Sequence, residues 1–225
     1  MAHEQEKEAA ARASLQFIKD GQVVGLGTGS TAAYFIKQLA ERVKNGLCIR
    51  GIPTSIHSQN LALSLGIPLT TLDECQEIAV TVDGADEVDP QLRLIKGGGG
   101  AMLREKIVAS ATKQLVIVAD SSKQVPVLGR FPVPVEVIPF AQALVAKRIQ
   151  ALGAEVQVRS GADGKPFITD EHNHILDCHF GPIGDVNALA RQLSDMPGAV
   201  EHGLFIGMAN VALFARGTEI IELRR

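Results

Sequence analysis

Short runs of β-branched and aliphatic residues alternate with amphipathic stretches in the first half of the chain. The runs end at Gly, Asp or Ser, and the stretches between them repeat their apolar positions at helical spacing. The pattern predicts strands at 22–26, 47–52, 67–72, 77–82 and 115–119, and helices at 31–43, 58–65 and 100–112. Because strands and helices alternate, we expect an α/β fold with a doubly wound, mostly parallel sheet of the Rossmann-like class.

The pattern changes at Pro126, the first of several closely spaced prolines that interrupt regular structure. Beyond them it predicts a strand at 133–137, a helix at 141–152, strands at 155–159 and 174–180, a helix at 184–195 and a strand at 200–205. This βαββαβ order is that of a ferredoxin-like α+β unit. Strands at 211–215 and 219–223 then return to the first sheet. We therefore predict a main Rossmann-like domain of residues 1–129 and 206–225, and a smaller inserted domain of residues 130–205.

Charge and hydropathy exclude several classes of function. The net charge of the 225 residues is −3 and the charges are scattered, so there is no basic face for nucleic acid. The apolar runs are far shorter than the roughly 20 residues of a membrane span. Residues 1–13 alternate Glu, Lys and Ala like a solvated helix and lack a signal-peptide pattern. We expect a cytoplasmic protein whose partners are small molecules, not nucleic acid or a membrane.

The cysteines and histidines form no pattern typical of metal binding or catalysis. Three cysteines lie far apart and outside any CxxC or Cys/His spacing. Histidines 57, 172, 174, 179 and 202 form neither a zinc-binding HExxH motif nor a catalytic triad. We therefore expect no disulfide, no metal, no cofactor and no catalytic histidine.

The first candidate site is the glycine-rich turn Gly25–Thr31, which follows a predicted strand and opens a predicted helix. Its amides and the hydroxyls of Thr28, Ser30 and Thr31, together with Gly29, can bind an anion such as a phosphate. The dinucleotide fingerprint requires Gly where Ser30 stands, and no Gly-Lys-Ser/Thr completes a phosphate P-loop. A tight strand-to-helix turn without a ligand is the alternative.

The second candidate is the segment Thr81–Glu87, at the carboxyl end of an apolar strand, where doubly wound sheets bind ligands. Asp83 and Asp86 are separated only by Gly84 and Ala85, so both carboxylates can face one cleft. There they can hydrogen-bond sugar hydroxyls or relay their protons. The alternative is a capped turn.

The third candidate is the segment Ile95–Lys106, a strand end followed by four glycines and a helix start. Glycines 97, 98 and 99 let the backbone approach a ligand closely, whereas a flexible linker rarely joins a strand directly to a helix. Lys96 can place a positive charge beside a developing oxyanion, and Glu105 can face the same cleft from the helix. A solvated Glu105 on the helix surface is the alternative. Lys123, just after another strand end, can reach a phosphate.

Together these segments, with Pro134–Pro139 and Gly203–Phe205, resemble type A ribose-5-phosphate isomerase in order and spacing from about residue 20 to near the C-terminus. The resemblance implies the reversible conversion of D-ribose 5-phosphate to D-ribulose 5-phosphate, in the pentose phosphate pathway, by a homodimer without metal or nucleotide. It implies that Glu105 is the base that moves a proton between C2 and C1, and that Lys96 stabilises the enediolate. It assigns ring opening and hydroxyl proton transfer to Asp83 and Asp86, and substrate binding to Lys123, Ser30 and Thr31.

Two other functions are considered beside this one. A sugar-phosphate-sensing binding domain is the first, but only about 20 residues precede the first predicted strand, too few for a helix-turn-helix. The second is an isomerase that acts on another sugar phosphate, such as an aminosugar-phosphate isomerase, whose ring opening calls for a catalytic histidine.

Overall fold

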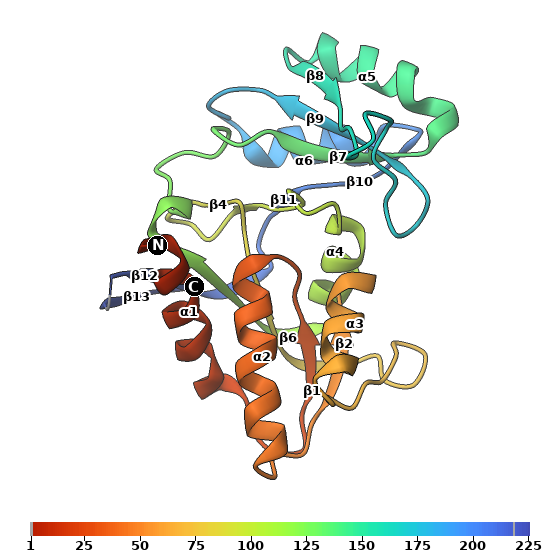
Figure 1. Ribbon diagram of the computed structural model, residues 1–225. Coiled ribbons are helices and arrows are strands. Elements are labelled where there is room, and N and C mark those ends of the chain that lie inside the picture. The colour runs from red at the N-terminus through yellow and green to blue at the C-terminus, as the bar shows by residue number, and fades with distance from the viewer. Residues whose placement is uncertain (1, 218) are drawn as a thin grey trace.

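The computed structural model describes residues 2–217 and 219–225, and it contains three sheets. The largest has six strands in the order β13-β12-β6-β3-β1-β2 (Figure 1). Its strands are β1 (Val23–Leu26), β2 (Arg50–Pro53), β3 (Ile78–Asp83), β6 (Thr112–Asp120), β12 (Ala209–Arg216) and β13 (Glu219–Arg224). All neighbouring pairs are parallel except β12 and β13, which form an antiparallel edge. The predicted doubly wound, mostly parallel α/β sheet is confirmed.

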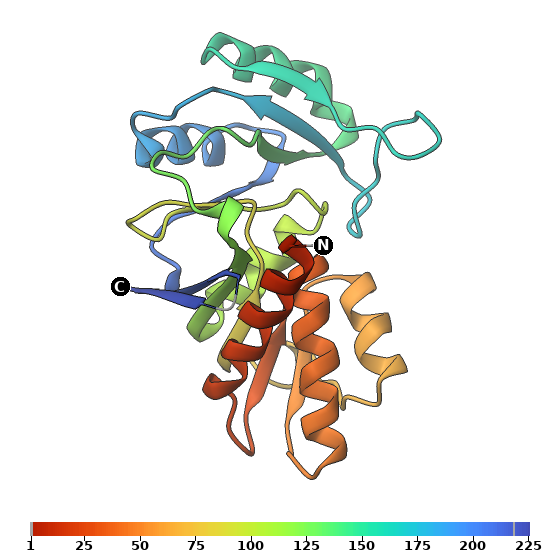
Figure 2. The same cartoon turned by 60° about the vertical axis from the view of Figure 1, so that its left-hand side comes forward.

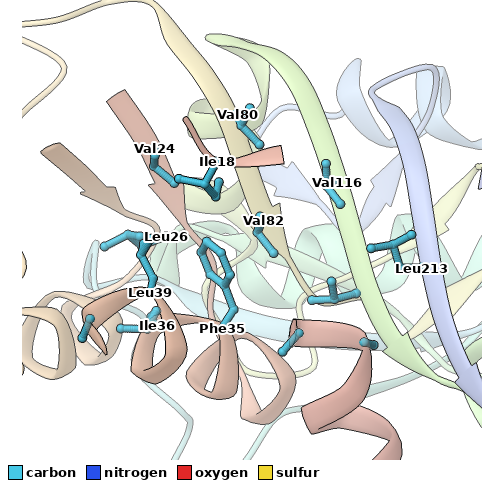
Figure 3. Packing of buried hydrophobic residues seen from close by; sticks show 14 of the residues in the cluster. Ile18, Val24, Leu26, Phe35, Ile36, Leu39, Val80, Val82, Val116 and Leu213 are labelled. Atoms are coloured by element: carbon cyan, nitrogen blue, oxygen red, sulfur yellow. The ribbon is translucent and has the colours of Figure 1, made fainter. Parts of the chain in front are cut away.

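Three helices pack on one face of this sheet: α1 (Ala2–Ser14), α2 (Ser30–Lys44) and α3 (Ile56–Ser64). A short 3₁₀ turn, η1 (Leu15–Phe17), connects α1 toward β1. Figure 3 shows Phe35, Ile36 and Leu39 of α2 packed against Val82 and its neighbours on the strands. Alternate residues of β6 point to opposite faces, so both faces of this strand are buried and apolar, as expected for a central parallel strand.

The opposite face is covered by α4 (Met102–Ser110) and by a small three-stranded sheet in the order β11-β5-β4. The strands β4 (Glu87–Val88), β5 (Leu94–Ile95) and β11 (Leu204–Phe205) have two residues each. Such short strands carry no recognisable periodicity, and the sequence pattern did not predict β4. A 3₁₀ turn, η2 (Ser121–Lys123), follows β6.

The third sheet has four antiparallel strands in the order β10-β7-β9-β8, formed by β7 (Val133–Val137), β8 (Glu155–Val158), β9 (His174–His179) and β10 (Ala199–His202). With η3 (Pro139–Ala141), α5 (Gln142–Ala151) and α6 (Val186–Ser194) they follow the predicted βαββαβ order. This unit has its own cluster of buried apolar residues and lies above the six-stranded sheet in Figures 1 and 2. The domain boundaries at 129/130 and 205/206 stay a prediction.

Three predicted features are wrong in detail. Residues 67–72 form no strand, because Pro68 has no N–H to donate and only Leu69 bridges to Gly51 of β2. The strand predicted at 200–205 is divided at Gly203, so β10 pairs with β7 whereas β11 pairs with β5. The N-terminal helix is not solvated all round: α1 packs on α2 and β6 and buries Ala10 and Ala11 completely.

Candidate active site

A cavity of about 270 Å³ lies at the carboxyl ends of β1 and β3. The order β2-β1-β3 places these two strands where the chain reverses its direction of winding, which is the place where doubly wound sheets bind ligands. The cavity brings together segments that are far apart in the sequence. It is lined by His3, Lys7, Thr28, Gly29, Ser30, Thr31, Gly84, Ala85, Asp86, Lys96, Gly97, Gly98, Gly99, Glu105, Asp120, Ser122 and Lys123.

One side of the cavity is formed by the turn between β1 and α2. Helix α2 begins at Ser30, and the amides of its first turn have no intrahelical acceptor and carry the positive end of the helix dipole. Gly29 has a φ of 103°, a conformation that favours glycine. The Thr28 hydroxyl, in contrast, contacts Thr54 at 2.7 Å and donates to Ser55 at 2.8 Å. The hydroxyl of Ser30 is therefore better placed than that of Thr28 to meet an anion.

A close approach of two strand ends fixes the position of Asp83. A side chain at Gly27 would collide with the Asp83 carboxylate, so only glycine lets the backbone of β1 pass this close to β3. Asp83 Oδ1 accepts hydrogen bonds from the amides of Thr28, at 3.0 Å, and Gly84, at 2.7 Å. The carboxylate is consequently buried and held in one orientation.

Lys96 lies between two buried carboxylates at the floor of the cavity. Its Nζ is 3.1 Å from Asp83 Oδ2 and 3.3 Å from Glu105 Oε2, and it donates to the Gly84 carbonyl at 2.5 Å. The backbone of Lys96 is anchored by donation to the Gly203 carbonyl, at 2.9 Å. The contact with Glu105 has an ion-pair distance without hydrogen-bond geometry, and within the described part of the chain Glu105 Oε2 has no hydrogen-bond partner.

This environment changes the proton affinity of both groups. Burial raises the pKa of Glu105 to about 8, because the favourable charge of Lys96 does not offset desolvation and the carboxylates of Asp83 and Asp86 raise it further. Burial disfavours the charge on Lys96, but Asp83 and Glu105 outweigh it and the pKa of Lys96 is raised. The cavity therefore contains a permanent cation beside a carboxyl group that can accept and return a proton near neutral pH.

The glycine loop, residues 97–99, forms another part of the cavity wall. Asp86 Oδ2 accepts a hydrogen bond from the Gly98 amide at 2.8 Å. A Cβ at Gly98 would lie 2.6 Å from Asp86 Oδ1, so the contact between loop and carboxylate requires glycine there. Among the described residues no group donates to Oδ1, and Asp86 lines the cavity. This oxygen is free to meet a ligand.

Four residues of the cavity wall were not predicted as site residues: Asp120 and Ser122, which stand beside Lys123, and His3 and Lys7 of α1. Their helix reads as solvated because Glu and Lys dominate it, but its packing on α2 and β6 brings its first two turns to the cavity. The available signal for a packed helix was its small apolar residues, of which Ala10 and Ala11 are buried, alongside the charged ones. Lys7 and Lys123 thus add two cations to the cavity wall, from α1 and η2, besides Lys96.

His3, Glu6 and Asp120 form a group whose ligand atoms lie within 4.8 Å of one another among the described residues. Glu6 already accepts from Ser121 and Gly217, and Asp120 accepts from Ser122. Backbone donation from Gly217, with Ser121, lowers the pKa of Glu6 to about 2. The carboxylates are thus engaged as hydrogen-bond acceptors, and we assign no metal to the group.

The structure brings nearly all the predicted site residues to the cavity wall. Asp83 is the exception, because it lies behind Lys96 and acts on the cavity through that side chain. The alternative of a solvated Glu105 is wrong, since its side chain is only 5% exposed. No helix in the described part of the chain has the length and apolar character to cross a membrane.

Comparison with known proteins decides the family. A family model for ribose 5-phosphate isomerase A (phosphoriboisomerase A) matches residues 50–219. The ribose-5-phosphate isomerase A of Parvibaculum lavamentivorans is 52% identical to this chain, over 98% of it and 99% of the relative. The chain belongs to the ribose 5-phosphate isomerase A family.

Solved structures of isomerases agree with this assignment. A D-ribose-5-phosphate isomerase in complex with phospho-erythronic acid has a TM-score of 0.97 at 40% identity, with 100% of each chain covered. Ribose 5-phosphate isomerase A from Methanocaldococcus jannaschii has a TM-score of 0.93 at 41% identity, covering 97% of this chain and 98% of its own. The resemblance stated from the sequence is confirmed, and the protein is an isomerase rather than a sensing domain.

Proposed function

We propose that this isomerase interconverts D-ribose 5-phosphate and D-ribulose 5-phosphate with Glu105 as the base that carries the proton. The observation that supports this most directly is the buried Glu105 carboxyl group, whose raised pKa and unpartnered Oε2 leave it ready to accept a proton beside Lys96. An aldose–ketose isomerisation needs one such group, placed next to a fixed positive charge.

The proposed chemistry follows from the contact between Glu105 and Lys96 in the cavity. Glu105 removes the proton from C2 of the open-chain aldose, which leaves negative charge on the oxygens of an enediolate. The Lys96 ammonium stabilises this charge, and Glu105 returns the proton to C1. The ligand of the related structure, phospho-erythronic acid, is a sugar acid with a carboxylate at one end and a phosphate at the other. A carboxylate is planar and negatively charged like the enediolate, so a ligand of this kind suits a site that stabilises the enediolate.

The two aspartates differ in what their oxygens contact, and we assign them different tasks. Both oxygens of Asp83 are engaged, Oδ1 by amides and Oδ2 by Lys96, so Asp83 holds the lysine in place. Asp86 Oδ1 is unoccupied by any described donor, so Asp86 is the carboxylate that opens the furanose ring and moves hydroxyl protons. Asp86→Asn should therefore impair turnover of the cyclic sugar more than proton exchange from the open chain.

We place the phosphate of the substrate near the start of α2, Lys7 and Lys123, because the free amides of the helix and two cations meet there in the cavity wall. We expect Lys123→Ala to raise KM for ribose 5-phosphate about ten- to a hundredfold with little change in kcat, because a remote phosphate contact acts as ground-state binding worth about 1.5 to 3 kcal/mol. Steady-state kinetics measure both constants. Lys113→Ala is the matched control, since Lys113 is exposed and pairs with Glu77. A collapse of kcat with unchanged KM would place Lys123 in the chemistry instead.

The activity should depend on pH through Glu105. Only the ionised carboxylate can take the proton, and its pKa is raised to about 8, so kcat/KM should rise with pH and level off above about 8. The phosphate of the substrate titrates at about 6 and gives a separate limb. A pH profile measured from about pH 5 to 9 tests this. A limb near 6 alone, or a limb near 8 that persists in Glu105→Gln, would contradict it.

We further propose that the protein is a cytoplasmic homodimer that serves the pentose phosphate pathway, without metal or cofactor. Support for self-association comes from exposed apolar side chains around η3 and α5, where Phe140 is 98% and Leu144 51% exposed. Sedimentation equilibrium measures the assembly state, and a monomer at micromolar concentration would contradict it.

A further inference from the structure

A cation from the four-stranded sheet reaches the glycine loop of the cavity. Arg159 directly follows β8, and its Nη1 donates to the carbonyl oxygens of Gly97, at 2.8 Å, and Gly98, at 3.2 Å. Its side chain is only 13% exposed. Arg159 is thus bound to the glycine loop, although no described residue of the four-stranded sheet lines the cavity.

Asp177 of β9 fixes the orientation of this guanidinium group. It accepts from Nε at 2.9 Å and from Nη2 at 2.5 Å, a two-point contact that matches the planar geometry of arginine. The remaining Nη1 hydrogens therefore point at the glycine loop without freedom to rotate. A lysine cannot reproduce this arrangement, because its single ammonium cannot bind Asp177 at two points and both carbonyls at once.

The two carbonyls belong to peptide groups that face the chemistry. The carbonyl of Gly97 shares its peptide group with the amide of Gly98, which donates to Asp86 Oδ2 at 2.8 Å. The carbonyl of Gly98 shares its group with the amide of Gly99, a residue of the cavity wall. A cation on a carbonyl oxygen polarises the peptide and strengthens its N–H as a donor.

We infer that Arg159 is a positioning residue for isomerisation, which acts through these two peptide groups to orient Asp86 and the amides of the glycine loop. The inference rests on the proposed role of Asp86. The Arg159–Asp177 pair of the four-stranded sheet would then influence turnover at the cavity of the six-stranded sheet. The four-stranded unit would thus take part in the reaction.

The first test compares kinetics of Arg159→Gln, Arg159→Lys and wild type. We expect Arg159→Gln to lower kcat about ten- to a hundredfold, or about 1.4 to 2.8 kcal/mol, with KM changed less than about threefold. Inhibition by phospho-erythronic acid should weaken by a similar factor, whereas inhibition by inorganic phosphate should not change. Arg159→Lys should retain the fold, and its kcat should lie between those of wild type and Arg159→Gln. If the glutamine variant does not fold, the lysine variant tests the inference.

The matched control is Arg104→Gln. Arg104 pairs with Glu171 at 2.5 Å and Asp170 at 3.8 Å, so it joins α4 to the same region of the smaller unit without touching the glycine loop. Because Arg104 and its partners are more exposed than the Arg159–Asp177 pair, its loss should lower the melting temperature only slightly and leave kcat within about twofold. Equal losses of kcat in both variants would mean that the effect is only structural and would overturn the inference.

A double-mutant cycle with Asp86→Asn separates this inference from the function on which it rests. If Arg159 acts through Asp86, Arg159→Gln should cost less than about threefold in the Asp86→Asn background. Fully multiplicative losses, or a kcat of Arg159→Gln within about twofold of wild type, would overturn the role of Arg159. An active Asp86→Asn protein would instead overturn the proposed role of Asp86.

Discussion

Replacing Glu105 with glutamine is expected to lower kcat by about 10² to 10⁴, the usual contribution of a positioned general base, or about 2.7 to 5.4 kcal/mol of barrier. The amide keeps the shape of the side chain but cannot accept a proton at any working pH. Substrate binding should change much less, because Glu105 is not among the residues proposed to hold the phosphate.

Isotope exchange makes this prediction specific to proton transfer. In deuterated water the wild-type enzyme should exchange the C2 hydrogen of ribose 5-phosphate, and Glu105→Gln should not, as NMR of the substrate would show. Glu136→Gln is the matched control: Glu136 is also a buried glutamate with a raised pKa, caused by burial, but it accepts from Thr169 and Asn173 away from the cavity. A folded Glu105→Gln enzyme that keeps more than about a tenth of the wild-type rate, or still exchanges the hydrogen, would make another residue the base.

The second large effect is expected for Lys96→Met, which removes the cation beside the enediolate. Loss of one such oxyanion-stabilising group costs about 10² to 10³ in kcat. Without the ammonium, Asp83 and Glu105 become unpaired buried carboxylates, and breaking a buried pair costs about 3 to 5 kcal/mol of folding free energy. Urea unfolding and steady-state kinetics measure the two effects separately.

The pH dependence of stability tests whether the unpaired Glu105 carboxylate causes the loss of stability in Lys96→Met. In Lys96→Met the pKa of Glu105 in the folded state should rise further, since the lowering influence of Lys96 is gone. A carboxyl group with a raised folded pKa favours the folded state when protonated, so the variant should lose stability as pH rises from the unfolded value of about 4.3 toward the folded value. Because Glu105 of the wild type also stays protonated below about pH 8, the destabilisation of the variant relative to wild type should grow chiefly above about pH 8.

Lys106→Met is the matched control for this substitution. Lys106 is a largely buried lysine whose Nζ lies 4.8 Å from the ring centroid of Phe205, and it pairs with Glu201 at 2.7 Å outside the cavity. Its loss should destabilise the protein but lower kcat less than about tenfold. Equal losses of kcat in the two variants would mean that Lys96 acts through stability and not through the oxyanion.

Much of the site could be predicted because parallel strands end at one edge of their sheet. Glycine-rich or acidic segments after several apolar strands must therefore meet, whatever the details of packing. This reasoning correctly placed Asp86, which follows β3, in the same cavity as Ser30, which follows β1, whereas Lys96 reaches the cavity from β5 of the three-stranded sheet. It could not assign different roles to Asp83 and Asp86, because these roles depend on which amide groups and which ammonium group each carboxylate contacts.

Residues on helices and between units were harder to predict. Lys7 reaches the cavity only because α1 packs on α2 and β6, and its sequence reads like a solvated helix. Arg159 contacts the glycine loop from an edge strand of a separate sheet, and that contact depends on the pairing of β8 with β9 and on Asp177. Neither the hydrophobic pattern nor the local spacing of residues indicates contacts between segments so far apart in the sequence.

By itself the sequence determined the α/β architecture, the strand ends that form the cavity, and the resemblance to the isomerase family, since these depend on local periodicity and on residue types in order. Only the tertiary structure decided that Glu105 is buried against Lys96 and Asp83 and titrates far from its ordinary range. The physical reason is that a pKa depends on desolvation and on charges a few ångströms away. Those neighbours come from β3, β5 and α4, and only the packed fold brings them together.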